Sequence, residues 1–110
     1  SAHLDLRVQI KWVDTEKVEN NHDGVAKSLV GVNAVIVPGG FGSRGIEGKI
    51  QLIQYVRENN IPFLGICYGM QLAVVEFARH VCKMKGANTI EVEMDGGKVE
   101  TPVIAYLPGQ

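Results

Sequence analysis

Residues 63–71 constrain the fold of this chain more than any other stretch. An apolar run that begins at Ile61 ends in Cys67, which lies between Gly65 and Gly69, and a segment of helix-forming residues follows. This order is typical of a nucleophile elbow, in which a strand turns sharply into a helix and small neighbours allow the two to approach closely. Cys67 would then lie at a helix N-terminus, where unpaired N–H groups favour a thiolate. The alternative is a structural cysteine that packs at a strand end like a small hydrophobic residue.

The composition fits one ordinary soluble domain. The chain has 110 residues, of which 45% are hydrophobic and 21% charged, and its net charge is −1. That charge gives no electrostatic reason to expect a nucleic-acid or membrane partner, and no apolar run reaches the roughly 18 residues of a membrane span. Two cysteines do not make a disulfide framework, and free thiols fit a reducing compartment such as the cytoplasm. Three histidines without ligand spacing give no reason to expect a metal site.

Hydrophobic periodicity predicts strands and helices in alternation. Continuous apolar runs predict strands buried on both faces of a parallel sheet at residues 34–37 and 61–66, and amphipathic spacing predicts helices at 46–59 and 70–81. Alternating apolar and polar residues predict another strand at 6–13. Weaker signals predict a short helix at 25–30 capped by Asp23, a strand at 89–93, a hairpin-type turn at 95–97 and a last strand at 103–106. This order implies βαβ units and a parallel sheet with helices on both faces.

A glycine-rich loop at residues 39–42 follows the predicted strand at 34–37. Loops at the carboxyl ends of parallel strands are where such sheets bind ligands, and Cys67 is expected at the same edge. The spacing fits neither the dinucleotide-binding pattern nor the P-loop, so an oxyanion hole is a more economical interpretation than a phosphate cradle or a mere tight connection. The backbone N–H groups of Gly40 and Tyr68 are the natural donors for an oxyanion formed at Cys67.

These motifs resemble the class I glutamine amidotransferases, which share Pro-Gly-Gly, here residues 38–40, and Gly-Ile-Cys-x-Gly-Met-Gln, here residues 65–71. Residues 37–50, 71–79 and 87–91 resemble the glutaminase domains of the CTP synthase family in particular. The resemblance extends from Val8 to Leu107. It implies a flavodoxin-like α/β fold, a three-layer sandwich with a mostly parallel sheet that is incomplete at both ends in this chain. Residues 1–110 would form a partial glutaminase domain, because the family's opening strand and first helix have no counterpart here.

The resemblance implies that Cys67 is the nucleophile that hydrolyses glutamine to glutamate and ammonia through a thioester. It assigns the oxyanion hole to Gly40 and Tyr68. It assigns glutamine binding to Gly40, Tyr68, Gly69, Met70, Gln71 and Glu91, the last of which would meet the α-amino group. Tyr68 stands where the family has leucine, but only its backbone is needed for the oxyanion hole, and Thr89 stands where the family usually has serine. On its own, Glu91 would be interpreted as a solvated strand residue.

The resemblance also implies partners outside these residues. A separate synthetase domain would use the ammonia, with ATP and magnesium, to aminate UTP to CTP in pyrimidine nucleotide biosynthesis. The glutaminase domain itself would need no cofactor and no metal. The resemblance further implies a cytoplasmic homo-oligomer, a tetramer of the full protein, and a GTP effector. The sequence does not indicate what residues 92–101 do.

The general base of the family has no counterpart in this sequence. The family supplies a His-Pro-Glu element, whereas no His-x-Glu occurs here. His80 would lie about 20 Å from Cys67 along one helix, at 1.5 Å per residue, so we do not expect it to be the base. His22 and His3 belong to no motif. We therefore interpret the chain as part of a larger protein and expect a polypeptide of these residues alone not to hydrolyse glutamine.

Two other functions stay open. A non-catalytic regulatory or binding module would explain the absent histidine, although a strained elbow has little reason to exist without chemistry. An amidotransferase that makes a purine or an amino-acid precursor is opposed by the segments 41–45 and 76–79.

Several other residues carry structural predictions. Trp12 is expected in the core or on a strand face, and Cys82 is expected to be an inert thiol. Arg44 is expected to be an exposed ion-pairing residue, with an approach to substrate, effector or partner domain as the weaker hypothesis. The remaining prediction concerns helix carboxylates that are expected to be solvated, namely Glu47, Glu58 and Glu76.

Overall fold

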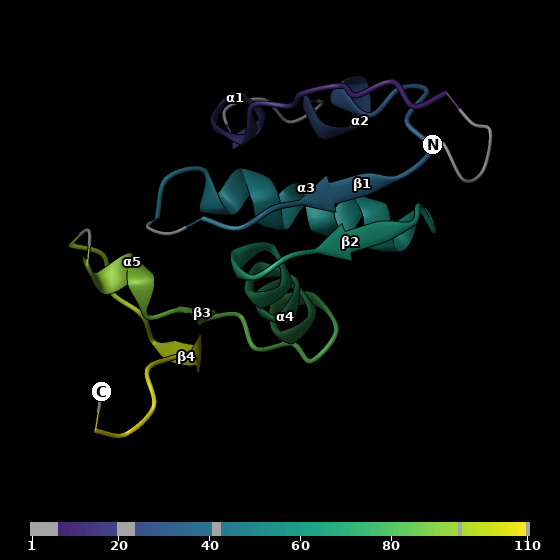
Figure 1. Cartoon of the computed structure of the whole chain (residues 1–110). Helices are drawn as coiled ribbons and strands as arrows, with labels where there is room; N and C mark the ends of the chain where they lie inside the picture. The colour runs from purple at the N-terminus through teal and green to yellow at the C-terminus, as the bar shows by residue number, and fades with distance from the viewer. Residues whose placement is uncertain (1–6, 20–23, 41–42, 95, 110) are drawn as a thin grey trace.

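The computed structural model describes residues 7–19, 24–40, 43–94 and 96–109. In chain order its elements are α1 (Thr15–Glu19), α2 (Gly24–Ser28), β1 (Val35–Val37), α3 (Ile46–Glu58), β2 (Phe63–Gly65), α4 (Tyr68–His80), β3 (Ala87–Thr89), α5 (Glu91–Met94) and β4 (Thr101–Ile104). Figure 1 shows α1 and α2 at one end of the molecule, the strands β1 and β2 with α3 and α4 in the middle, and β3, β4 and α5 at the other end.

Two short parallel sheets organise the described residues. β1 pairs with β2 in a register that runs from Val35↔Phe63 to Val37↔Gly65, and β3 pairs with β4. Along the chain α3 connects β1 to β2, and α5 lies between β3 and β4. Parallel strands need such crossover connections. The predicted alternation of strands and helices with parallel pairing is therefore confirmed.

The two predicted amphipathic helices are confirmed as α3 and α4, which pack against each other. Apolar residues recur every three or four positions along each helix, as expected for helices that cover a core. The buried side chains that make this core from the two helices are Ile46, Ile50, Leu52, Ile53, Val56, Tyr68, Leu72 and Val75.

One face of the β1–β2 sheet is buried and the other is exposed. Val35 and Val37 are buried. Ile36, which lies between them, and its partner Leu64 on β2 are 62% and 55% exposed. Because successive side chains point to opposite faces of a strand, helix packing on one face leaves these residues on the other. Within the described residues the sheet is therefore covered on one face, so the predicted three-layer arrangement is present in part.

Glu76 is buried in α4, although the sequence analysis expected a solvated carboxylate. Its side chain is 2% exposed, and Arg57 of α3 donates from Nε and Nη2 to its oxygens at 2.8 to 3.1 Å. A buried carboxylate is tolerated when it is paired and hydrogen-bonded in this way. The hydrogen bonds to Glu76 raise the pKa of Arg57, so the guanidinium stays charged and ties α3 to α4.

Replacement of Arg57 by methionine should destabilise the packing of α3 against α4. It leaves the buried Glu76 carboxylate without its main partner. Because the Arg57 side chain is itself 36% exposed and screened by water, we expect about 2 kcal/mol rather than the larger cost of a fully buried pair. Hydrogen–deuterium exchange of α3 and α4 peptides measures this loss. Arg44→Met is the matched control, because Arg44 pairs with Glu16 on the surface, and equal exchange in both variants would contradict the prediction.

A second arginine connects three elements. Arg79 of α4 donates from Nη1 and Nη2 to the Glu47 carboxylate of α3 at 2.8 and 3.0 Å, and from Nε to the carbonyl oxygen of Ala87 at 2.6 Å. Glu47 remains half exposed, which agrees with its predicted solvation. This contact fixes the start of β3 against the helix that follows Cys67.

The predicted strand at 6–13 is wrong where the structure describes it. Residues 7–14 form no regular element, and Trp12, expected in a core or on a strand face, is 87% exposed. Val8 and Ile10 show the same alternation and are also exposed. An alternating pattern becomes a strand only when another strand pairs with it, and none of the described residues does so.

The C-terminal predictions need two corrections. The segment predicted as a strand at 89–93 instead contains the end of β3 and the helix α5, because the Thr89 hydroxyl accepts a hydrogen bond from the Glu91 N–H at 3.3 Å and caps the helix. The strands on either side of the predicted hairpin turn are parallel, so they form no hairpin. Asp95 and the proposed cap Asp23 lie outside the described residues.

Within the same described ranges, no helix is long and apolar enough to cross a membrane.

Candidate active site

Cys67 lies at a sharp turn between β2 and α4. Its backbone has φ 55° and ψ −110°, a conformation that side-chain-bearing residues rarely adopt. The turn is held by hydrogen bonds from the Ile66 N–H to the Val37 carbonyl at 2.9 Å and from the Gly69 N–H to the Ile66 carbonyl at 3.0 Å. The Cys67 side chain is exposed. The strained turn, the flanking strand and helix, and the accessible sulfur are the geometry that the sequence predicted for a nucleophile elbow.

Gly65 and Gly69 are where the strand and the helix come closest. A Cβ on Gly69 would lie 2.0 Å from the Val37 carbonyl oxygen, and a Cβ on Gly65 would lie 2.8 Å from the Met70 nitrogen. Both distances are far inside van der Waals contact. The two glycines therefore allow β1, β2 and the first turn of α4 to meet directly beneath Cys67.

The glycine loop after β1 lies beside this elbow. A Cβ built on Gly39 would lie 3.5 Å from the Cys67 Cβ, and one built on Gly40 would lie 3.7 Å from Tyr68 Cδ1. The reason is the parallel pairing of β1 with β2, which brings the carboxyl ends of both strands to one edge. In Figure 1 the chain leaves β1, β2 and β3 toward the same side of the molecule. Residues 41–42 of the loop lie outside the described residues.

The residues after Cys67 have different exposures. The Tyr68 side chain is 1% exposed, and Gly69 is also buried in α4. Met70 is 55% exposed, and Gln71 is half-buried. The Gln71 N–H donates to the Cys67 carbonyl at 3.1 Å, which closes the first turn of α4. The described structure thus groups Gly40, Cys67 and Tyr68 closely, with Met70 and Gln71 on the adjoining helical turn.

Glu91 is the predicted site residue that lies farthest along the chain. It is the first residue of α5, directly after β3, and its side chain is half-buried. β3 packs against α4. Glu91 is therefore a helix N-terminal residue and not the strand residue that the sequence pattern suggested. A capping signal, Thr89 followed by two acidic residues in the first turn, could have located this helix.

His80 is the last residue of α4, whereas Cys67 immediately precedes its first residue. The His80 Nδ1 lies 3.2 Å from Glu76 Oε1, so its ring takes part in the Arg57–Glu76 contact. His3 and His22 lie outside the described residues. Over the part of the chain with described coordinates, no group of three or more His, Cys, Asp or Glu side chains is placed to hold a metal ion.

The structure also places Arg44 and Cys82, for which the sequence analysis predicted no catalytic role. Arg44 forms an ion pair with Glu16 and its side chain is 86% exposed, as expected for an exposed ion-pairing arginine. The hydrogen bond with Glu16 raises the pKa of Arg44. Cys82 is exposed beyond the end of α4.

Lys49 is a residue that the sequence analysis missed, and its Nζ lies 5.7 Å from the centroid of the Tyr68 ring.

Comparison with known proteins defines the class of this domain. Residues 1–107 match the sequence model of the family glutamine amidotransferase class-I. The chain belongs to this family.

Several CTP synthases are similar to this chain. The CTP synthase of Desulfitobacterium hafniense is 55% identical over 108 residues, which cover 98% of this chain and 19% of that protein. The CTP synthase of Pyrococcus furiosus is 51% identical over 110 residues, which cover 100% of this chain and 19% of that protein. A solved structure of the Trypanosoma brucei CTPS glutaminase domain with bound acivicin has a TM-score of 0.86 at 38% identity, covering 96% of this chain and 39% of that chain.

These likenesses confirm the predicted resemblance and the flavodoxin-like α/β fold, of which the described sheets are a part. The chain spans 19% of the length of the two curated relatives described above.

Proposed function

We propose that this chain is the part of a CTP synthase glutaminase domain that carries the nucleophile, and that it hydrolyses glutamine within the complete protein. The observation that carries the proposal is the strained elbow at Cys67 with the Gly39-Gly40 loop against it. A strained φ at a residue with a side chain persists where the surrounding structure enforces it, and such positions cluster at active sites. The similarity to CTP synthases along nearly the whole chain supports the same conclusion.

The proposed reaction begins with attack of the Cys67 thiolate on the carboxamide carbon of glutamine. A tetrahedral intermediate forms, and its oxyanion accepts hydrogen bonds from the backbone N–H groups of Gly40 and Tyr68. The carbon–nitrogen bond then breaks, ammonia leaves with a proton supplied by a general acid, and a thioester to Cys67 remains. Water attacks the thioester and releases glutamate and the free thiol. The histidine that would carry these protons belongs to the His-Pro-Glu element, which this sequence does not contain.

Substrate binding is proposed for the residues around the elbow and for α5. Gly40, Tyr68 and Gly69 would lie against the reacting carboxamide, and Met70 and Gln71 follow on the first turn of α4. Glu91, at the N-terminus of α5, would accept hydrogen bonds from the substrate ammonium, which is the natural partner of a carboxylate.

The partners of the site are proposed from the name of its relatives, CTP synthase. Ammonia would pass to a synthetase domain that aminates UTP to CTP, with ATP and magnesium bound there and not by these residues. A tetrameric assembly, a GTP effector and a cytoplasmic location belong to the same proposal. Residues 1–110 would be one part of the glutaminase domain.

A non-catalytic module is the second candidate, because no His-x-Glu occurs in these 110 residues. It differs from the first in one measurable property, the reactivity of Cys67 toward a glutamine-like electrophile.

The test is covalent labelling of the whole gene product with a diazo-ketone analogue of glutamine, followed by intact mass and peptide mapping. We expect one adduct on Cys67 and none on Cys82, although both thiols are exposed. Excess glutamine should protect Cys67, because reagent and substrate would compete for one site. Equal labelling of both cysteines, or labelling that glutamine does not slow, would support the non-catalytic module instead.

A further inference from the structure

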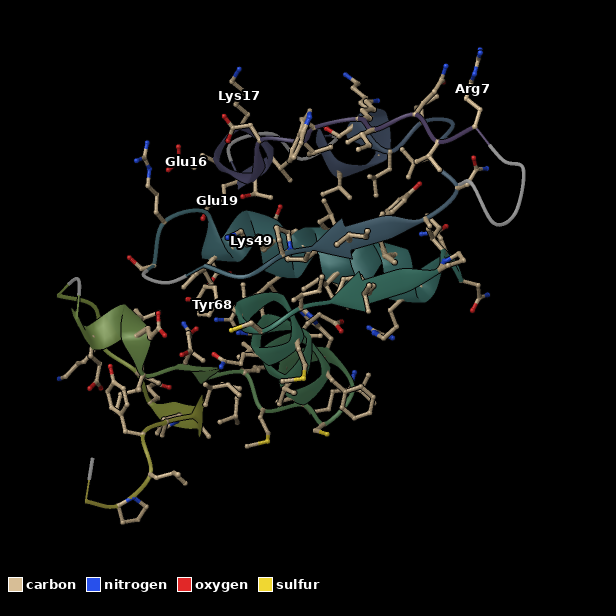
Figure 2. All side chains as sticks on the ribbon, viewed as in Figure 1. Arg7, Glu16, Lys17, Glu19, Lys49 and Tyr68 are labelled. Atoms are coloured by element: carbon tan, nitrogen blue, oxygen red, sulfur yellow. The ribbon has the colours of Figure 1, made fainter. Side chains whose placement is uncertain are left out.

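Lys49 lies close to both residues to which the oxyanion hole is assigned. Its Nζ lies 5.7 Å from the centroid of the Tyr68 ring, within the range of a cation–π contact. A Cβ built on Gly40 would lie 3.9 Å from the same nitrogen and 3.7 Å from Tyr68 Cδ1. One ammonium group therefore lies near both the Gly40 backbone and the Tyr68 ring. Figure 2 shows Lys49 on α3 above Tyr68 at the start of α4.

The position of Lys49 in its helix is unfavourable for the helix itself. Lys49 lies in the first turn of α3, and its N–H donates to the Gly45 carbonyl at 3.0 Å. The N-terminal end of a helix carries partial positive charge, so an acidic side chain is favoured there and a cation is not. The helix dipole therefore does not favour a cation at this end of α3, although lysine is otherwise a good helix former.

The Tyr68 ring beside Lys49 is held in place by the core. The Tyr68 side chain is 1% exposed and belongs to the buried core. A ring held this firmly offers the Lys49 ammonium group a fixed cation–π surface. The Gly40 backbone lies beside the same ring, so the ammonium group is placed to act on both segments.

We propose that Lys49 is a positioning residue of the glutaminase site, which holds the Gly40 loop over Tyr68 so that their two N–H groups converge on one oxyanion. This inference rests on the proposed function, because an oxyanion forms only if Cys67 attacks an acyl substrate. The positive charge beside Gly40 has a second effect. It stabilises the negative charge that develops in the tetrahedral intermediate more than it stabilises the neutral carboxamide of bound glutamine.

The experiment compares Lys49→Met and Lys49→Arg in the whole gene product, with Lys85→Met as the control. Lys85 is an exposed lysine in the connection between α4 and β3. We expect Lys49→Met to lower kcat for glutamine hydrolysis about tenfold, since loss of one complete oxyanion donor costs about 10²–10³. KM should stay within about twofold, because the contact acts in the transition state. Lys49→Arg keeps the charge and stacks on an aromatic ring, so it should stay within about threefold of the parent protein.

Several results would overturn the proposal. If Lys49→Met raises KM and leaves kcat unchanged, Lys49 binds the substrate instead of positioning the donors. If Lys49→Met behaves like Lys85→Met, the contact with Tyr68 has no role in the reaction. If Lys49→Arg loses as much activity as Lys49→Met and both lower the melting temperature, the residue is merely structural.

A second measurement decides the proposal without turnover. Hydrogen–deuterium exchange should become faster in Lys49→Met, but not in Lys49→Arg, in the peptides that contain Gly40 and Tyr68. If the parent protein does not hydrolyse glutamine, the proposed function fails while this exchange result still tests whether Lys49 holds the two segments together. Unchanged exchange in both variants would overturn the positioning role.

Discussion

Replacing Cys67 with alanine is expected to lower glutamine-dependent activity of the whole gene product by about 10⁴-fold or more, as removal of a catalytic nucleophile does in comparable hydrolases. The Cys67 sulfur is exposed at a strained turn, next to the Gly39-Gly40 loop, and the proposed mechanism has no other group that could form the thioester. The measurement is the rate of glutamate release, with the rate of CTP formation from glutamine followed in parallel.

Ammonium chloride provides the decisive comparison for Cys67→Ala. If ammonia made at Cys67 is used by a separate synthetase domain, added ammonium should restore CTP formation in the variant. Cys82→Ala is the matched control and should keep glutamine-dependent activity, because Cys82 is exposed beyond the end of α4. Substantial glutamate release by the alanine variant would show that Cys67 is not the nucleophile.

The elbow was predictable because its signal is local. Gly65, Cys67 and Gly69 lie within five consecutive residues, and the need for small neighbours follows from the geometry of a strand that turns into a helix. The structure adds the contacts that explain each glycine, namely the Val37 carbonyl above Gly69 and the Met70 backbone beside Gly65. For the same reason the two amphipathic helices could be predicted, because apolar residues recur at helical spacing within each segment.

Features that depend on distant partners could not be predicted in this way. Glu76 has the pattern of a solvated helix carboxylate, and its burial follows from Arg57, nineteen positions earlier in the chain. The alternation around Trp12 is that of a strand, yet a strand exists only where another strand pairs with it. Lys49 shows nothing in sequence that connects it to Tyr68, since the contact arises from the packing of α3 against α4.

The segment after β3 is an intermediate case, because a local signal was present but a different one was followed. Ile90 and Val92 alternate with acidic residues, which favours a strand. Thr89 followed by Glu91 and Glu93 is at the same time a helix-start signal, since a capping hydroxyl and acidic residues favour the N-terminal turn. The cap prevails in the structure, and Glu91 is consequently presented from a helix terminus.

Replacing Gly69 with alanine is expected to destabilise the elbow by about 3 kcal/mol or more, at or beyond the upper end of ordinary overpacking. The new Cβ would lie 2.0 Å from the Val37 carbonyl oxygen and 2.9 Å from Val37 Cγ1, and both belong to a paired strand that cannot retreat without breaking β1–β2. Glutaminase activity should fall with stability, because the displaced strand carries the glycine loop and the displaced helix carries Tyr68. Hydrogen–deuterium exchange of peptides from β1 and α4 measures the loss.

Gly31→Ala is the control for backbone strain alone, since Gly31 has φ 75° with no atom within 4 Å of its Cβ position. This substitution should cost only about 1–2 kcal/mol. Equal effects of the two substitutions would show that the close approach of strand and helix beneath Cys67 does not hold the elbow in place.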